Sequence, residues 1–353
     1  MQEQLSPRQQ VILRFLVEEY VESGRAVGSR TLTERYSLGV SPATVRNEMA
    51  VLERLGYIEH PHTSAGGVPT DQGFRHYVER YAVRSQLPAS DQLMIRHQFR
   101  QVETQLEGWM QLAASVLAEI AGNLAIVTSP RSRQARLRHF EALSLQERLA
   151  LLIVVTQDSS VTQSMLHLEE PATQPELRAV ADRLNSELAN LNAGEAQLFV
   201  SELEGLERLI GEQVLTALAA AESGERTDVR SEGFEYMVRQ PEFAGDTDLR
   251  QIFRLMRGGT LLSILLPQLT DERGVQIFIG EENAPAILQP FGIVVASYGV
   301  GRHVTGLLGI VGPRRMPYER SISSVRYMAD LMSDLMHDLY FEQLPGGENA
   351  TPS

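Results

Sequence analysis

The sequence has no cysteine and no lysine among its 353 residues. The absence of cysteine excludes disulfides, thiolate zinc sites, iron–sulfur clusters and catalysis by a thiol. No hydrophobic run approaches the roughly 20 residues that a membrane-spanning helix needs, and the first ten residues are too polar for a secretion signal. Aromatic residues make up only 6%, but 43% of the residues are hydrophobic, which is typical of a folded chain of two or three domains. We therefore expect a cytoplasmic protein that does not contact membranes.

Positive charge is also scarce, because 32 arginines stand against 45 acidic residues and the formal net charge is −13. Residues 1–80 are nearly balanced, with nine arginines and ten acidic residues, and most of the acidic excess lies beyond them. A strongly acidic protein binds nucleic acid poorly through its bulk charge. Any contact with DNA must therefore come from arginines placed locally in the first 80 residues.

The start of the chain shows the pattern of three short helices. Ser6 and Gln9 form a capping box, with proline at the first helical position, and hydrophobic residues then follow on one helical face. Ser29 is expected to cap a second helix, and Gly56 is expected to close a third helix that begins at Ser41-Pro42. Two helices joined by a short turn with glycine are typical of a helix-turn-helix.

The third helix carries the strongest indication of DNA binding. At about 100° per residue, Val45, Met49 and Leu52 fall on one buried stripe. The opposite face combines alanines, which can touch a thymine methyl group, with arginine and asparagine, which read guanine and adenine. Taken alone, this face is equally compatible with a solvated helix in an ordinary three-helix domain. The candidate DNA-binding residues of this helix are Ser41, Ala43, Thr44, Arg46, Asn47, Ala50 and Arg54.

A hairpin pattern follows the third helix. Residues 57–60 alternate like a short strand, residues 68–70 can return beside them, and the glycine-tipped loop 61–67 between them is expected to lie along a phosphate backbone. Another helix starts at Thr70-Asp71. A helix-turn-helix followed by a two-stranded hairpin predicts a winged helix. The remaining candidate DNA contacts are Arg30, His62, Thr63, Ser64 and Gly66.

These residues resemble one protein family, the heat-inducible transcription repressors HrcA. The resemblance is dense over Leu5–Tyr81, resumes near the C-terminus, and is only general over residues 157–257. Gly67 stands where the family usually has arginine at the wing tip, which predicts the loss of a phosphate contact there. The motifs that carry the resemblance are Leu5-Ser6-Pro7-Arg8-Gln9, Val27-Gly28-Ser29-Arg30-Thr31-Leu32, Ser41–Met49, Leu52–Ile58, His62–Gly66, Gly280-Glu281-Glu282-Asn283, Tyr298-Gly299-Val300-Gly301 and Gly309–Met316.

The resemblance implies an α+β multidomain fold. It has an N-terminal winged helix-turn-helix and a GAF-like α/β domain that is interrupted by an inserted, mostly helical dimerisation domain. The expected boundaries are 1–82 for the winged helix, 91–169 and 233–343 for the two parts of the GAF-like domain, 170–232 for the insertion and 344–353 for a disordered tail. Strand patterns occur at 124–128, 137–143, 149–156, 161–168, 275–279, 292–297 and 304–311, and helical patterns at 91–121, 175–191, 195–223 and 322–339.

The resemblance also implies a function and partners. The family represses chaperone operons as a homodimer on double-stranded DNA with an inverted-repeat operator (CIRCE), and the chaperonin GroEL maintains its active form. Two alternatives stay open: a regulator whose GAF-like domain senses a small molecule, and a chaperone-interacting protein recognised through its hydrophobic C-terminal helix.

Enzyme and cofactor functions find little support in the sequence. The eight histidines show no metal-binding spacing, with His60-Pro61-His62 the nearest to one. Gly299-Val300-Gly301 lacks the third glycine of a dinucleotide-binding loop, because position 304 is valine. We therefore expect no catalytic residue, no metal site and no cofactor.

Overall fold

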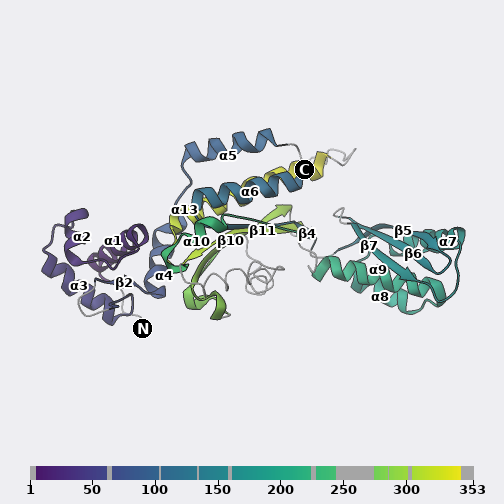
Figure 1. Ribbon diagram of the computed structural model, residues 1–353, viewed down its shortest axis with the longest axis horizontal. Helices are drawn as coiled ribbons and strands as arrows, with labels where there is room; N and C mark the ends of the chain where they lie inside the picture. The colour runs from purple at the N-terminus through teal and green to yellow at the C-terminus, as the bar shows by residue number, and fades with distance from the viewer. Residues whose placement is uncertain are drawn as a thin grey trace, which may run out of the picture. The chain divides into compact units, whose positions relative to one another are not determined.

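The computed structural model describes residues 5–61, 66–102, 105–132, 135–157, 161–223, 228–243, 274–284, 286–300 and 304–342 (Figure 1). The chain divides into two compact units. The first unit comprises Met1–Thr128, Val229–Tyr298 and Leu307–Ser353, and the second comprises Ser129–Asp228 and Gly299–Gly306. The tail predicted at 344–353 lies outside the described residues.

The first unit begins with the winged helix. Its elements are α1 (Pro7–Ser23), α2 (Ser29–Arg35), α3 (Pro42–Arg54), β1 (Ile58–Glu59), β2 (Val68–Pro69) and α4 (Asp71–Arg80). Both bonds of the capping box between Ser6 and Gln9 are formed, and Gly24 ends α1 in the left-handed region with φ 64°. The prediction for α2 was wrong in detail: Gly28 is its N-cap, and Ser29 is a buried first helical residue whose side chain caps nothing. The domain core contains Ile12, Leu16, Val45, Met49, Leu52, Ile58 and Phe74.

The rest of the first unit is an antiparallel sheet with helices, which corresponds to the expected GAF-like domain. The strands are β3 (Leu124–Thr128), β8 (Val229–Glu232), β9 (Val275–Ile279), β10 (Phe291–Val300) and β11 (Val304–Pro313). The helices are η1 (Ala82–Arg84), α5 (Ala89–Gln101), α6 (Leu106–Ala121), α10 (Phe234–Val238), η2 (Pro241–Phe243), η5 (Gly280–Glu282), η6 (Ala286–Leu288) and α13 (Tyr318–Glu342). The strands lie in the order β8-β3-β11-β10-β9, and α6 and α13 pack together, with α6 against β3 (Figure 1). The helical pattern over 91–121 is divided between α5 and α6.

Over the side chains that the structure describes, up to Met336, the hydrophobic face of the C-terminal helix α13 packs inside the first unit. Ile322, Val325 and Met332 on that face are fully buried in the first unit. The alternative that a chaperone recognises this helix therefore loses its structural basis, because the apolar side chains already pack inside the domain. No helix in the described part of the chain is long and apolar enough to cross a bilayer.

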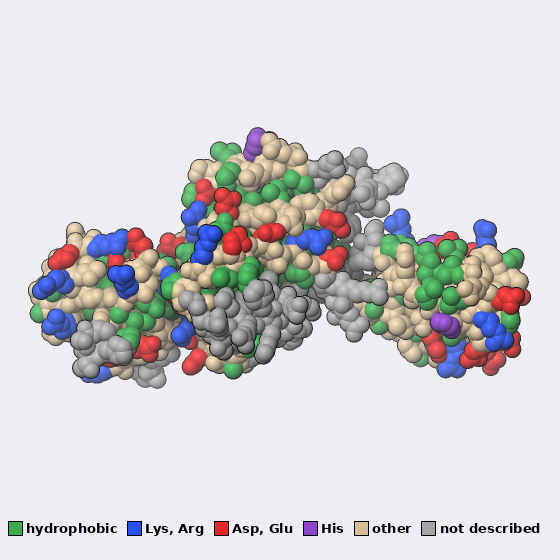
Figure 2. All heavy atoms as spheres, viewed as in Figure 1, with side chains coloured by type: hydrophobic (Ala, Val, Ile, Leu, Met, Phe, Trp, Pro, Cys, Tyr) green, Lys and Arg blue, Asp and Glu red, His purple; other side chains and the backbone are tan. Residues whose placement is uncertain are grey.

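The second unit is a three-stranded antiparallel sheet with helices on one face. Its elements are β4 (Arg131–Ser132), β5 (Leu137–Gln146), β6 (Leu149–Thr156), β7 (Val161–His167), α7 (Gln174–Leu188), α8 (Ala193–Ser201) and α9 (Gly205–Ser223), with sheet order β5-β6-β7. Phe140, Leu152 and Leu166 pack from the sheet into one core with Leu184 and Val214 of the helices. Alternate residues point away from the helices, and hydrophobic side chains are visible on the surface of this unit (Figure 2).

The start of this unit differs from the predicted insertion. The sequence predicts the insertion at 170–232 and the strands before it in the GAF-like domain. In the structure the unit extends from Ser129 to Asp228, because β5, β6 and β7 pair with one another in register and bury their inner face under the helices that follow. Of the strands predicted between 124 and 168, β3 instead joins the sheet with the order β8-β3-β11-β10-β9.

Candidate DNA-binding interface

The sequence of α3 determines which of its faces remains free. Ser41 is the N-cap, and its Oγ accepts a hydrogen bond from the backbone N–H of Thr44 at 3.2 Å, while Pro42 occupies the first turn. Val45, Met49 and Leu52 are at most 3% exposed and hold the helix on the domain core. Because these residues form one stripe, the opposite side of the helix faces solvent.

The predicted contact residues of α3 lie on that solvent side. Thr44 is half-buried, and its hydroxyl lies 3.0 Å from the hydroxyl of Ser41. Within the part of the chain that the structure describes, the side chains of Arg46, Asn47 and Arg54 form no hydrogen bond or ion pair. Their donors are therefore available to base edges and phosphates. The exposed members of the set are Ser41, Ala43, Arg46, Asn47, Ala50 and Arg54.

Several other arginines of this domain are already paired with acids. Arg35 contacts Glu19 at 2.9 Å and Glu22 at 2.7 Å, and Arg14 contacts its helical neighbour Glu18 at 2.7 Å. These contacts neutralise acidic side chains away from the exposed face of α3.

One of the two acidic residues of α3, Glu48, is turned inward, whereas Glu53 is exposed and lies 2.9 Å from His60 Nδ1. Glu48 accepts a hydrogen bond from Gln9 Nε2 at 3.0 Å and lies 3.7 Å from Arg8. Glu48 therefore faces α1 rather than the solvent side of the helix. Arg30, at the start of α2, is exposed and has no acidic partner recorded in the described part of the chain.

The described part of the wing is its base, which consists of β1, β2 and the residues next to them. Ile58 pairs with Pro69 and Glu59 with Val68, and a bridge between Val27 and Gly67 extends the ribbon. His62, Thr63 and Ser64 lie outside the described residues.

Gly66 and Gly67 are required by close packing at this base. A Cβ on Gly66 would lie 2.3 Å from the carbonyl carbon of Val27, so no side chain fits there. Gly67 exchanges two backbone hydrogen bonds of 2.9 Å with Val27 and is buried. The expectation that Gly67 marks the wing tip was wrong, because a Cβ at this position would point to Met49 Cε at 3.0 Å and Ile58 Cδ1 at 3.1 Å in the core.

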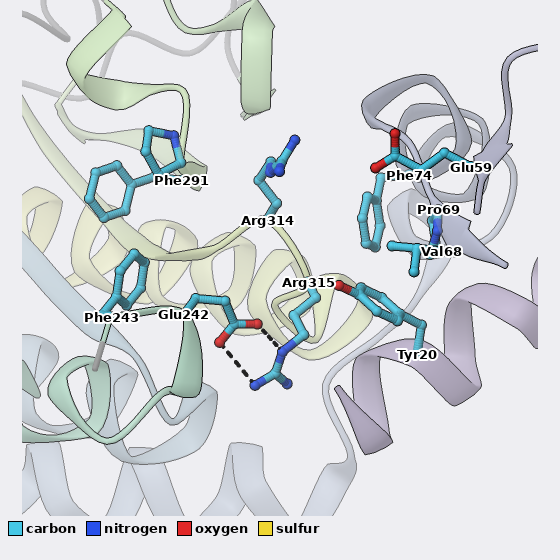
Figure 3. Close-up of a pocket in the computed structure, with 11 residues that line it drawn as sticks. Tyr20, Glu59, Val68, Pro69, Phe74, Glu242, Phe243, Phe291, Arg314 and Arg315 are labelled. Carbon is cyan, nitrogen blue, oxygen red and sulfur yellow. Dashed lines mark hydrogen bonds and ion pairs between the residues drawn. The ribbon is translucent and has the colours of Figure 1, made fainter. Parts of the chain in front are cut away.

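A cavity of about 340 Å³ lies elsewhere in the first unit, between β2 at the base of the wing and Phe291 at the start of β10 (Figure 3). Tyr20 and Phe74 form one wall, and Phe243 forms part of another. The guanidinium of Arg315 is bonded to the carboxylate of Glu242 at one side of the cavity, with a second bond of 3.2 Å from Nη2 to Oε2. Burial raises the pKa of the Tyr20 hydroxyl, and the nearby Glu242 adds to the shift. No group of three or more metal-ligating side chains occurs within the described ranges.

Comparisons with known proteins show the family of the chain. Residues 4–79 match the family model of the winged helix-turn-helix transcription repressor HrcA DNA-binding domain, and residues 107–322 match that of the HrcA protein C-terminal domain. A protein of Thermomicrobium roseum named heat-inducible transcription repressor HrcA is 48% identical and aligns over 95% of this chain and 97% of its own. Proteins of the same name from Roseiflexus castenholzii and Dehalococcoides mccartyi are 40% and 35% identical, with at least 95% of each chain covered. The crystal structure of a hypothetical protein, 22% identical, has a similar fold with a TM-score of 0.58 over 94% of this chain and 99% of its own.

Proposed function

Because this chain belongs to the HrcA family of heat-inducible transcription repressors, we propose that it represses chaperone operons by binding DNA through its winged helix and that heat relieves the repression. The observation that carries the proposal is the exposed face of α3. Arg46 and Asn47 project from a helix whose other side is fixed on the domain core, and the described residues record no partner for either side chain. A preorganised helix with free donors suits the major groove of DNA.

Each side chain on this face has a role that its chemistry supports. Arg46 reads guanine by two parallel hydrogen bonds, and Asn47 reads adenine in the same way. Ala43 and Ala50 allow the helix to approach closely and contact thymine methyl groups. Arg54, at the far end of α3, anchors a phosphate, as Arg30 does from α2.

The binding unit is a homodimer on an inverted-repeat operator, since two-fold protein symmetry matches a palindrome. The uncovered face of the β5–β7 sheet supports this. Leu143, Leu151 and Met165 lie side by side across its three strands, and Leu143 and Met165 are 38% and 54% exposed. Val161, on the same edge strand as Met165, is 58% exposed. A second copy packed on this face would remove these apolar side chains from water.

Heat acts through the chaperonin GroEL in this proposal. GroEL maintains the DNA-binding form at normal temperature, and unfolded proteins occupy it after a heat shock. The amount of active repressor then falls, and transcription rises. Folded proteins are stabilised by only about 5–15 kcal/mol, so a modest loss of folding assistance is enough to change the active fraction.

Binding to labelled inverted-repeat DNA, with and without GroEL and nucleotide, tests the proposal. We expect the purified protein to bind the intact repeat far more tightly than a scrambled one, and GroEL to raise the binding-competent fraction. Equal binding to intact and scrambled DNA would contradict the DNA-reading role. Full activity that GroEL leaves unchanged would contradict the chaperonin step alone.

A further inference from the structure

Two segments from the C-terminal half of the chain contact the DNA-binding domain. Gly280–Asn283 follows strand β9, and Pro313–Met316 ends β11 and leads into α13. We propose that these segments form a seat that fixes the orientation of the winged helix, and that Asp71 and Arg75 of α4 are positioning residues for binding both operator half-sites. The inference rests on the proposed function, because it concerns how two recognition helices are held for one operator.

Arg75 makes the central contact of the seat. Its Nε donates to Glu282 Oε1 at 2.7 Å, a second bond joins the same two side chains, and Nη2 donates to the carbonyl oxygen of Ile277 at 2.8 Å. The backbone N–H of Ile279 also donates to Glu282 at 2.8 Å, so a hydrogen bond within its own segment holds the carboxylate in addition to Arg75. Burial lowers the pKa of the Arg75 guanidinium, but the hydrogen bond and charge of Glu282, together with smaller contributions from Glu79 and Tyr318, raise it overall above its usual value. A bidentate pair of this kind restricts orientation as well as distance.

Asp71 makes a second contact at the start of α4. Its carboxylate accepts a hydrogen bond from the backbone N–H of Glu281 at 2.9 Å and another from Arg314 Nη1 at 3.2 Å. Gly280 allows this approach, because a Cβ on it would lie 1.9 Å from Asp71 Oδ2, and its φ of +56° also favours glycine. The contact with the DNA-binding domain therefore explains the glycine in Gly280-Glu281-Glu282-Asn283.

The seat extends along α4 and reaches α1. Tyr77 donates from its hydroxyl to Glu319 Oε1 at 2.9 Å, and the ring of Phe74 lies 6.0 Å from that of Tyr318. Arg315, which borders the cavity in Figure 3, donates to the carbonyl oxygen of Val21 at 3.1 Å. Because α1 packs against both α4 and α3, the contacts at the seat also restrict the orientation of α3, the proposed recognition helix.

The effect of a fixed winged-helix orientation on affinity depends on whether the DNA contains one half-site or two. A dimer that binds two half-sites gains from the second contact only if both recognition helices are held at the right separation, whereas binding to one half-site has no such requirement. Loosening the seat should therefore weaken binding to the full operator and reduce its dependence on half-site spacing. Affinity for a single half-site should stay the same.

Charge reversal at the ion pair of Arg75 and Glu282 tests whether the seat fixes the orientation of the winged helix. Arg75→Glu and Glu282→Arg are each expected to weaken full-operator binding roughly tenfold or more and to flatten the response to spacer length, with half-site affinity within about twofold of the parent. The double variant, Arg75→Glu with Glu282→Arg, should restore both properties. Arg178→Glu is the matched control, because it makes the same charge change at an exposed pair in the second unit, 3.9 Å from Asp182.

The inference would be overturned if both single variants kept the parent's affinity for the full operator and its dependence on half-site spacing. A parallel loss of half-site affinity, or a double variant that restores nothing, would also overturn it, since either outcome indicates damage to the domain rather than lost positioning.

A measurement without DNA separates this inference from the proposed function. The chain has no cysteine, so spin labels can be attached at Arg30→Cys and His97→Cys, both exposed, in protein diluted with unlabelled copies. The distance distribution between the labels should be narrow in the parent and the double variant and broad in each single variant. Equally narrow distributions in all four proteins would refute the seat, even if the operator were of another kind.

Discussion

Removing the guanidinium of Arg46 should weaken operator binding and leave the domain folded. The side chain is exposed, and the described residues record no partner for it, so Arg46→Ala should change the free energy of unfolding by no more than about 0.5 kcal/mol. A bidentate contact with guanine contributes about 1–3 kcal/mol of discrimination, which corresponds to a loss of roughly 5- to 150-fold per half-site. A homodimer uses the contact twice, so the loss on the full operator could approach about 2–6 kcal/mol.

The assay is a gel-shift titration at one fixed salt concentration against the intact repeat and a set of single-base variants. Arg46→Ala should bind more weakly and should tolerate substitution at one position in each half-site, because the discriminating contact is gone. Arg178→Ala loses the same charge in the second unit and serves as the control, with circular dichroism to verify folding. If Arg46→Ala binds the intact repeat as tightly as the parent does, α3 is not the reading element.

Replacement of Arg54 should have a different signature. Arg54 lies at the last turn of α3 and is exposed, which suits a phosphate contact. Arg54→Ala should weaken binding to all sequences alike, and each lost phosphate contact should reduce the slope of log affinity against log salt by about 0.9. A change in base preference with an unchanged salt slope would instead assign Arg54 to base reading.

Three further outcomes follow from burial and charge. Met49→Ala, in the core at 3% exposure, should lower the free energy of unfolding by about 2–5 kcal/mol in urea titration, and an unchanged midpoint would contradict the packing described for α3. Burial, assisted by the charge of Arg80, lowers the pKa of His76 in the folded state. The unfolded chain therefore takes up the proton first, and stability should fall as the pH drops below about 6.5, with His76→Gln flattening a profile measured by urea unfolding. Met165→Arg should convert the dimer to a monomer in light scattering, and a dimer that persists at micromolar concentration would exclude the β5–β7 face as the interface.

Local chemistry made much of the DNA-binding domain predictable. The cap at Ser41, the proline after it and the stripe of Val45, Met49 and Leu52 all act within one helix, so the sequence alone defined α3 and its free face. Strand positions such as β3 and β9 were equally clear, because alternation and short apolar runs are local signals.

Sheet membership could not be predicted in the same way. The strand pattern at 149–156 has no feature that says whether it joins the sheet of β3 or forms one with β5 and β7, since strand pairing is a non-local property. Gly67 presents a similar case. Its bridge to Val27 joins residues that are far apart in the chain, so the local sequence does not show it and predicts this position at the tip of the loop. The contact between Arg75 and Glu282 joins residues 207 positions apart, and no local sequence pattern around either side chain predicts it.

The distribution of ion pairs reconciles an acidic chain with a DNA-binding role. Arg14 and Arg35 are engaged by glutamates of α1, and Glu48 of α3 turns toward Arg8, so much of the acidic charge of the winged helix is neutralised internally. Arg46 and Arg54 remain exposed on α3. Charges interact over only roughly 8 Å at physiological ionic strength, so acidic residues farther away in the chain contribute little at this face. The domain can thus bind a polyanion although the whole protein has a net charge of −13, because the local arrangement of its arginines determines the contact.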